Sequence, residues 1–402
     1  MNLNFIETAE MKYIRSETTN YNFNKITGRC EMWGKTLQDD IEFSELGPLI
    51  LDLEISTICN GYKGNTRCSI CYKAENGIKE SNMSLDTFKK IFDNLSLECY
   101  EVTLENGKTI WFNLDCYILD DDKNVFVKTF KVGDVYSFGT IKSISKTLRS
   151  TLNQCAFGSD ATGIANPEVF NMMEYARNRG VIPNITVANI SQETAERFSK
   201  LCGAISVSRY ADKNICYDTV KKLTDLGMTQ INIHQCISKY TKVQALETMN
   251  DMMTDPRLSK MNAIVLLSLK KKGNGEKMEI LSQEGFNELI NFAFENKIRF
   301  GMDSCSGAKF MKAIEGRLDF SEIMKVVEPC ESTKISCYIN VDGEYFSCSF
   351  CENTPSFPVG VDVVNSKNFL EDVWFHKSVK AWRENLLGRN RCGDYSCPAF
   401  EV

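Results

Sequence analysis

Long hydrophobic runs are absent from this sequence. The first residues, MNLNFIETAEMKYIRSETT, contain neither an apolar signal core nor a small-residue cleavage site, and no later run approaches the roughly eighteen apolar residues of a membrane span. We therefore expect a cytoplasmic protein without a membrane partner. The sequence also has no excess of basic residues: it contains 47 Lys and Arg and 53 Asp and Glu, which gives a net charge of −6. This balance argues against a nucleic-acid partner, which favours a basic face.

Length and composition indicate a folded chain of more than one unit. At 402 residues the chain exceeds what one hydrophobic core usually supports, and 43% hydrophobic with 25% charged residues is ordinary for a globular protein. We expect a large catalytic domain with one or two smaller additions.

Cysteine is abundant, with 17 residues. A chain without a signal peptide is expected to keep its thiols reduced, so metal ligation explains them better than a disulfide framework. Three lie within residues 59–71, and six more lie between residues 330 and 397. Isolated ones, such as Cys202, Cys216 and Cys236, are expected to be small buried hydrophobic residues.

Short apolar runs alternate with longer amphipathic stretches from residue 50 onward. This pattern predicts β/α units around a mainly parallel sheet, and thus an α/β fold. The expected strands are 49–56, 152–158, 182–188, 204–208, 230–236, 263–269 and 298–303, and the expected helices are 85–95, 167–179, 192–201, 216–226, 241–252 and 283–296. Ser84 can cap the first helix, and six or seven such units fit a partial (β/α) barrel.

Two segments break this rhythm. Residues 97–146 alternate β-branched and aromatic residues around two hairpin signals, Asn106-Gly107 and Asp122-Lys123-Asn124. We interpret them as a small inserted β lobe, which is either a surface addition or a substrate-docking module. Residues 1–49 lack the β/α periodicity and are interpreted as an N-terminal extension. The predicted barrel then comprises 50–96 and 147–328, and a further domain follows at 329–402.

Three cysteines share one loop directly after the first predicted strand. The segment CNGYKGNTRCSICY holds Cys59, Cys68 and Cys71, and its two glycines let the backbone fold around a bulky group. Loops at the carboxyl ends of parallel strands are the usual place for an active site in barrel folds. Three thiolates can bind three irons of a cubane and leave the fourth iron open. A zinc knuckle is the alternative, but structural zinc takes a fourth Cys or His, and the loop contains none.

The strand, the cysteine loop with Tyr72 after its last cysteine and the β/α repeat resemble the radical S-adenosylmethionine (SAM) superfamily over residues 50–305. The family's usual first gap is shorter than the eight residues found here, whereas the two-residue gap between Cys68 and Cys71 is the usual one. The resemblance implies a [4Fe–4S] cluster on Cys59, Cys68 and Cys71 that binds SAM and cleaves it reductively to methionine and a 5′-deoxyadenosyl radical. It also implies an electron donor such as flavodoxin or ferredoxin. This chemistry needs no general-base histidine, in agreement with a chain that contains only two.

Further SAM contacts follow from the resemblance at the ends of other predicted strands. Gly158, Ser159 and Asp160 correspond to the family's Gly-Gly-Glu stretch, and the Asp160 carboxylate would contact the SAM amino group. A β-to-α turn explains the same residues. The other predicted cofactor contacts are Ser206, Ser208, Arg209, Tyr72, His234 and Lys270. Among them the guanidinium of Arg209 suits a carboxylate, and a purely structural role for His234 is the alternative.

A second cysteine group begins at Cys330 and resembles the C-terminal extension called SPASM, or its shorter twitch form, which holds an auxiliary [4Fe–4S] cluster near a hairpin. Asp342-Gly343 in YINVDGEY predicts that hairpin, and residues 369–392 predict a helix that returns the last cysteines to it. The resemblance implies the ligands Cys330, Cys348, Cys392 and Cys397, with Cys337 and Cys351 as alternatives. A four-cysteine zinc site is the other interpretation, because ligand type alone does not separate zinc from iron–sulfur.

The resemblance implies radical chemistry on a peptide or protein substrate, as in maturases of ribosomally synthesised peptides (RiPPs). Radical modification of a small molecule or nucleotide is the alternative, since no winged-helix peptide-recognition module is evident at the N-terminus. A non-catalytic metal-binding scaffold is a third interpretation. The expected architecture is a partial (β/α)6-type radical SAM barrel with a small inserted β lobe and a SPASM/twitch-like hairpin-plus-helix domain.

Overall fold

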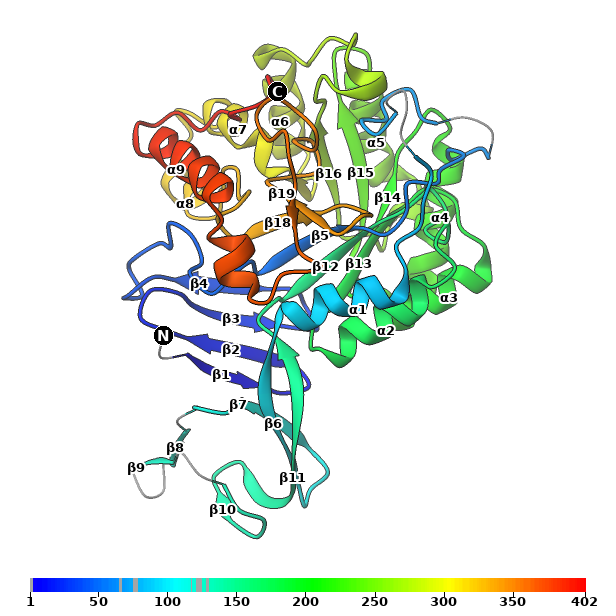
Figure 1. The fold of residues 1–402 in the computed structure, drawn as a ribbon. Coiled ribbons are helices and arrows are strands. Elements are labelled where there is room, and N and C mark those ends of the chain that lie inside the picture. The colour runs from blue at the N-terminus through cyan, green and yellow to red at the C-terminus, as the bar shows by residue number, and fades with distance from the viewer. Residues whose placement is uncertain (1–2, 65–66, 75–78, 117, 121–124, 128–129) are drawn as a thin grey trace.

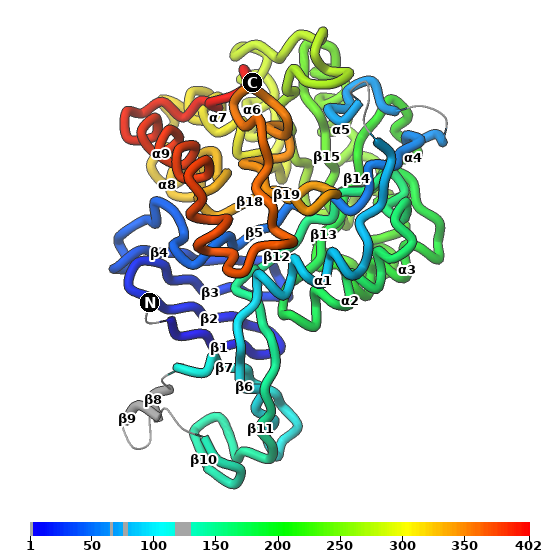
Figure 2. Tube along the Cα trace, in the orientation of Figure 1, coloured from blue at the N-terminus to red at the C-terminus, as the bar shows by residue number. Residues whose placement is uncertain are grey.

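A computed structural model describes residues 3–64, 67–74, 79–116, 118–120, 125–127 and 130–402 (Figures 1 and 2). One sheet of ten strands and one of eight organise the described part of the chain. Both sheets are open, and the fold is mixed α/β.

Seven neighbouring strands of the ten-stranded sheet, parallel to one another, carry its β/α units. In spatial order they are β17 (Phe300–Met302), β16 (Ala263–Ser268), β15 (Ile231–Ile237), β14 (Ala204–Ser208), β13 (Ile182–Val187), β12 (Gln154–Gly158) and β5 (Ile50–Glu54). The helices that follow them are α1 (Leu85–Asn94), α2 (Val169–Asn178), α3 (Gln192–Leu201), α4 (Lys213–Asp225), α5 (Lys242–Thr254) and α6 (Gln283–Glu295). The predicted β/α alternation is confirmed, and so is the cap of α1, where the Ser84 hydroxyl accepts from the Thr87 amide at 3.0 Å.

Alternation along the parallel strands separates an apolar face from a polar one. In β15, Ile231 and Ile233 are fully buried in the core beneath the helices, whereas Asn232 and His234 point to the opposite face and are half-buried. The other strands follow the same rule, so this opposite face carries Asp52, Gln154, Asn184, Thr186, Ser206, Asn232 and His234. We call it the inner face, and its polar side chains are available to a ligand.

The N-terminal extension and the predicted insertion form one antiparallel sheet. Its order is β10 (Val135–Tyr136), β11 (Gly139–Ser150), β6 (Ser96–Leu104), β7 (Thr109–Asn113), β1 (Asn4–Glu7), β2 (Met11–Arg15), β3 (Asn20–Asn24) and β4 (Cys30–Trp33). The joint is the pairing of β1 with β7, in which Ile6 lies opposite Phe112. The hairpin at Asn106-Gly107 is confirmed, with a bond from the Gly107 amide to the Leu104 carbonyl. The second signal, Asp122-Lys123-Asn124, lies outside the described residues, between β8 (Ile118–Asp120) and β9 (Val125–Val127).

Buried charges fasten this sheet to the amino ends of the parallel strands. The Lys12 ammonium donates to the Leu152 carbonyl, just before β12, and the Arg149 guanidinium donates to the Asn178 carbonyl at the end of α2, at 2.7 Å. Arg149 also donates to both Glu7 oxygens, at 2.7 and 2.8 Å. The sheet therefore covers the end of the parallel strands opposite their carboxyl ends, as Figure 1 shows.

The C-terminal segment continues the ten-stranded sheet. Strand β18 (Ser336–Ile339) pairs parallel with β5, and β19 (Glu344–Phe346) and β20 (Val361–Asp362) follow it antiparallel. The predicted hairpin is confirmed at Gly343, whose φ of +82° suits glycine. The remaining elements are the short helices Pro256–Leu258, Gly273–Gly275, Ser304–Ser306, α7 (Gly307–Ala313) and α8 (Phe320–Met324), a π-helical segment Phe369–Trp374, and α9 (Lys377–Arg391).

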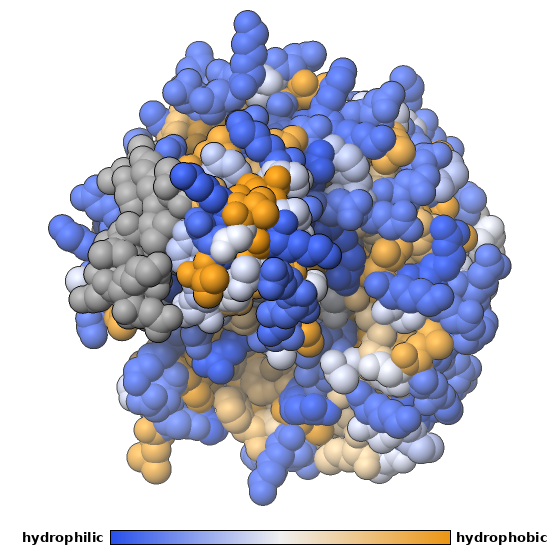
Figure 3. Space-filling model, turned by 90° about the horizontal axis from the view of Figure 1, so that it is seen from below, coloured by the Kyte–Doolittle hydropathy of each residue, from blue (hydrophilic) through white to orange (hydrophobic). Residues whose placement is uncertain are grey.

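The face of the molecule drawn in Figure 3 is mainly polar. Figure 3 looks onto the end that carries the β6–β11 ribbon and shows a small apolar group there, and Val132 and Val135 in this lobe are each 65% exposed. Among the described residues, no helix has both the length and the apolar character needed to cross a membrane.

Candidate active site

The loop that follows β5 carries Cys59, Cys68 and Cys71, and we call it the first cysteine loop. Arg67 holds its two ends together, because its guanidinium donates to the Thr57 carbonyl at 2.8 Å and to the Lys73 carbonyl at 3.0 Å. The two glycines of the loop, Gly61 and Gly64, adopt the left-handed conformation that favours glycine, with φ of +71° and +79°. The loop therefore lies at the carboxyl edge of the parallel sheet.

The three thiols of this loop are free and partly exposed. Burial raises the pKa of Cys71, and negative charge on Cys68 and Cys59 raises it further, so the three sulfurs lie within electrostatic range. Soft thiolates suit iron–sulfur clusters, and three of them on one loop fit a cubane with an open iron. Within the described residues, no three or more His, Cys, Asp or Glu side chains are arranged to hold a metal ion. The ligand sets therefore stay predictions.

Two tyrosines pack together at this loop: Tyr62 belongs to the loop and Tyr210 lies just beyond β14. Neither was identified as a site residue from the sequence. Burial raises the pKa of Tyr210 well above its usual range, and the nearby Cys68 raises it further. The ring of Tyr62 stacks on Tyr210, with centroids 4.6 Å apart. The segment just after β14 thus packs against the first cysteine loop.

The predicted Gly-Ser-Asp turn borders a cavity beside the first cysteine loop. A Cβ at Gly158 would lie 3.3 Å from the Glu54 Cα, so a side chain there would crowd β5. The Asp160 carboxylate accepts from the Thr162 hydroxyl at 2.6 Å and from the Ala165 amide at 3.1 Å, as a turn residue does. The cavity measures about 590 Å³ and is lined by Asn60, Gly61, Tyr62, Lys63, Gly64, Asp160, Thr162, Asn189 and Ile215.

Arg209 points away from the inner face. Its guanidinium pairs with Glu247 on α5 at 2.9 Å, with only 1% of the side chain exposed, and its Nε has no partner among the described residues. Ser206 and Ser208 lie on the inner face instead, and Ser208 is paired in register with His234. The serines, rather than Arg209, are therefore placed to meet a ligand on that face.

His234 in β15 and Lys270 after β16 both lie within electrostatic range of Asp303. The Nδ1 of His234 lies 3.4 Å from the Thr186 hydroxyl. Loss of hydration lowers the pKa of His234 to about 4, although the negative charge of Asp303 acts to raise it. The Lys270 ammonium pairs with Asp303 and lies 4.9 Å from the centroid of the Phe350 ring. Burial alone would lower the pKa of Lys270, but Cys305 and Asp303 outweigh burial and raise it. The imidazole is thus neutral and the lysine charged at neutral pH.

The His234 shift predicts an acid sensitivity. Because the folded state disfavours the protonated imidazole, stability is complete above the usual histidine pKa of about 6.5 and is lost as pH falls toward about 4. Between pH 7 and pH 5 we expect the metal-free protein to lose about 1 to 2 kcal/mol more than the His234→Gln variant. Urea unfolding of both proteins at the two pH values measures this difference, and equal losses would contradict it.

The second cysteine group gathers on the C-terminal side of the inner face. Cys330 is buried, and the charges of Cys348 and Cys397 raise its pKa beyond what burial does. The Cys351 backbone amide donates to the Cys348 carbonyl at 3.0 Å, and Cys351 also raises the pKa of the Cys348 thiol; we call 348–351 the second cysteine loop. Cys392, by contrast, is exposed at the end of α9. Cys305 also lies within electrostatic range of Cys330 and Cys348. Cys337, by contrast, lies in β18 near Asp52.

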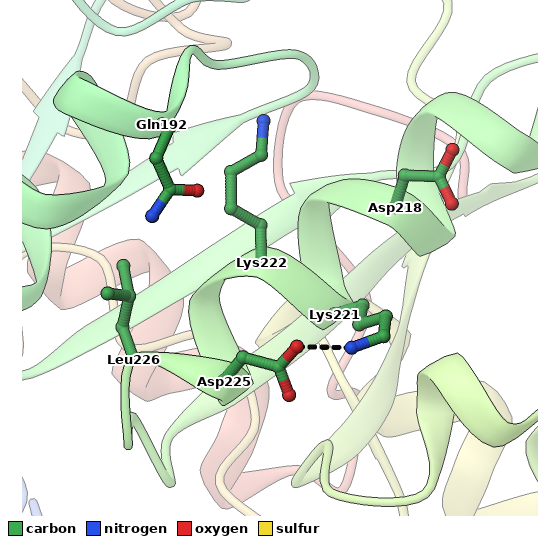
Figure 4. A pocket seen from close by; sticks show the side chains of 6 residues that line it. All are labelled: Gln192, Asp218, Lys221, Lys222, Asp225 and Leu226. Carbon is green, nitrogen blue, oxygen red and sulfur yellow. Dashed lines mark hydrogen bonds and ion pairs between the residues drawn. The ribbon is translucent and has the colours of Figure 1, made fainter.

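A second cavity, of about 430 Å³, lies between α3 and α4 (Figure 4). It is lined by Gln192, Asp218, Lys221, Lys222, Asp225 and Leu226, and Lys221 pairs with Asp225 in it. No thiol lines this cavity, so it offers no ligand for the predicted chemistry.

Comparison with known proteins gives a likeness of fold. No protein-family model and no curated protein sequence matches the chain. Two solved structures of Streptococcus suis SuiB match it with a TM-score of 0.54 at 12% identity; one is bound to S-adenosylmethionine and the other to the precursor peptide SuiA. The matches cover 84% and 83% of this chain and 68% and 66% of the SuiB chains. The resemblance predicted from the sequence is thus confirmed at the level of the fold, and this chain has the fold of SuiB.

Proposed function

We propose that this protein is a radical SAM enzyme. The observation that carries the proposal is the first cysteine loop: three partly exposed thiols at the carboxyl edge of a parallel sheet, in a chain that shares its fold with a SAM-bound protein. In this proposal the parallel strands form the partial (β/α) barrel, and residues 329–402 form the SPASM/twitch-like domain.

Cys59, Cys68 and Cys71 would hold the [4Fe–4S] cluster, which supplies one electron to cleave SAM when both are bound. Tyr210, which lies within electrostatic range of Cys68, would help to position its sulfur. The cavity beside the loop would receive SAM, with the Asp160 carboxylate at its rim for the amino group. Ser206, Ser208 and neutral His234 line the inner face, where they would bind polar groups of SAM or substrate without adding charge.

The substrate in this proposal is a peptide or protein, as for a RiPP maturase. One of the two SuiB structures contains a precursor peptide, which supports this class over a small molecule or nucleotide. An electron donor such as flavodoxin or ferredoxin would reduce the cluster.

A second, auxiliary [4Fe–4S] cluster would bind beside the inner face. Cys330, Cys348 and Cys397 influence one another electrostatically, which supports all three as ligands. The fourth ligand is Cys392 or Cys351. Contact with Cys348 favours Cys351, because a cluster needs its sulfurs close together.

Anaerobic reconstitution tests the proposal. The protein is loaded with iron and sulfide, reduced with dithionite and mixed with SAM, and 5′-deoxyadenosine and methionine are measured by mass spectrometry. Formation of both products supports the enzyme. A colourless protein that holds only zinc and leaves SAM intact would support a metal-binding scaffold instead.

A further inference from the structure

A buried group of charges joins the two cysteine loops. Lys73 lies two residues after the last cysteine of the first loop, and its ammonium is 3.0 Å from Glu54 Oε1. The same ammonium pairs with Glu352, which directly follows the second cysteine loop. The exposed fractions of the Lys73, Glu54 and Glu352 side chains are only 17%, 8% and 13%. One lysine therefore connects the end of β5 with the residue after the second loop.

The hairpin that starts at β18 completes this charge group. The Tyr338 hydroxyl accepts from Lys73 at 2.7 Å and lies 3.0 Å from Glu54 Oε2 and 3.2 Å from Glu352 Oε2. The Asn340 amide donates to Glu352 Oε1 at 3.1 Å. Because buried charges are costly without partners, each of these groups holds the others in place.

A second bridge runs from the segment after β16. Asn274 donates its backbone amide to the Cys71 carbonyl at 2.9 Å and its side-chain amide to the Cys68 carbonyl at 2.8 Å. Lys272, two residues earlier, donates to the Phe350 and Glu352 carbonyls at 3.2 and 2.7 Å. The backbones of both cysteine loops are thus bound to one short segment.

Aromatic contact adds to these bonds. The Tyr72 ring, next to the last cysteine of the first loop, lies 4.5 Å from the ring of Phe350 in the second loop, centroid to centroid. The charge group, the bridging segment and this ring pair all join the two loops. The two loops are therefore one packed unit, although 276 residues of sequence lie between Cys71 and Cys348.

We propose that Lys73 is a positioning residue that docks the first cysteine loop onto the second, so that order in each loop depends on order in the other. The inference rests on the proposed function only where it concerns metal. A cluster bound by one cysteine loop would then stabilise the folded conformation of the other loop, and the reverse would hold equally. The docking itself is a property of the polypeptide. It can be measured without activity.

Hydrogen exchange of the full-length protein tests the docking. Backbone exchange in segments 67–74 and 348–354 is followed by mass spectrometry in the wild type, Lys73→Met, Glu352→Gln and the double variant, with metal-free and iron-loaded protein. Lys79→Met is the matched control, because Lys79 is exposed shortly after the loop. We expect Lys73→Met to speed exchange in both segments at least about tenfold, and Lys79→Met to leave both unchanged. The double variant should add little to Lys73→Met, because both changes break the same pair.

The outcomes separate the docking from the proposed function. Faster exchange confined to 67–74 in Lys73→Met would overturn the docking, since the lysine would then stabilise only its own loop. If Lys73→Met fails to fold, Glu352→Gln, which keeps the side-chain shape, must speed exchange in 67–74, and unchanged exchange there would overturn it. If the wild type binds no iron, the proposed function fails, while the metal-free exchange still decides the docking.

Iron retention supplies the linked measurement. In the wild type, Cys348→Ala should speed loss of the remaining iron to a chelator at least about fivefold, because the first loop loses its ordered partner. In a Lys73→Met background the same cysteine change should have no further effect. An equal effect in both backgrounds would show that the loops communicate without Lys73 and would overturn its assigned role.

Discussion

The triple variant Cys59→Ala, Cys68→Ala, Cys71→Ala is expected to lose SAM cleavage entirely, a fall on the order of 10³-fold or more. The reason is that these thiols are the predicted holders of the reactive cluster, and the loop that carries them lines the cavity proposed for SAM. Iron content should fall by roughly four atoms per chain, the content of one [4Fe–4S] cluster. The measurements are 5′-deoxyadenosine yield and iron content after anaerobic reconstitution.

Cys202→Ala is the control for this variant, because Cys202 is a buried residue at the end of α3, away from both cysteine loops. It should keep its iron and its SAM cleavage. Full cleavage in the triple variant would refute the assignment of the first cysteine loop.

Removal of the auxiliary site is expected to have the second-largest effect. Cys348→Ala should lose roughly four iron atoms while the first cluster remains, because Cys348 lies at the centre of the second thiol group. Cys351→Ala should behave in the same way if the thiol that contacts Cys348 is the fourth ligand, whereas Cys392→Ala should keep its iron. Iron analysis and Mössbauer spectroscopy of the three variants measure this.

The reverse pattern, with iron lost in Cys392→Ala and kept in Cys351→Ala, would restore the ligand set that the sequence resemblance implies. It would require α9 to carry Cys392 from its exposed place to the other thiols. Zinc in place of iron in all of these proteins would favour a structural site.

Local patterns were sufficient to predict the parallel strands and their helices. The apolar run at 230–236, the Ser84 cap and the turns at Gly107 and Gly343 all act over a few residues, and the structure confirms them. The first cysteine loop could be placed for the same reason, because it follows a well-defined strand.

Long-range pairing could not be predicted in this way. The registers that place Ile6 opposite Phe112 and Ser336 opposite Ile50 join distant segments, and nothing in either local pattern specifies the partner. The N-terminal extension and the insertion therefore looked like two additions, although they form one sheet.

Side-chain direction could have been predicted better. Ser206 and Ser208 alternate onto the inner face, so the next residue, Arg209, falls on the opposite face, where it meets Glu247. Tyr210 and Lys73 had no such signal, because their partners, Cys68 and Glu352, lie in other segments of the chain.

The most direct test of the central claim is whether SAM binds an open iron on the first cysteine loop. The variant Cys330→Ala, Cys348→Ala, Cys397→Ala leaves only that site, and its reduced electron paramagnetic resonance spectrum is recorded with and without SAM. A [4Fe–4S] signal whose g-values change when SAM is added is the predicted result. A signal that SAM leaves unchanged, or a protein without a cluster, would contradict the account.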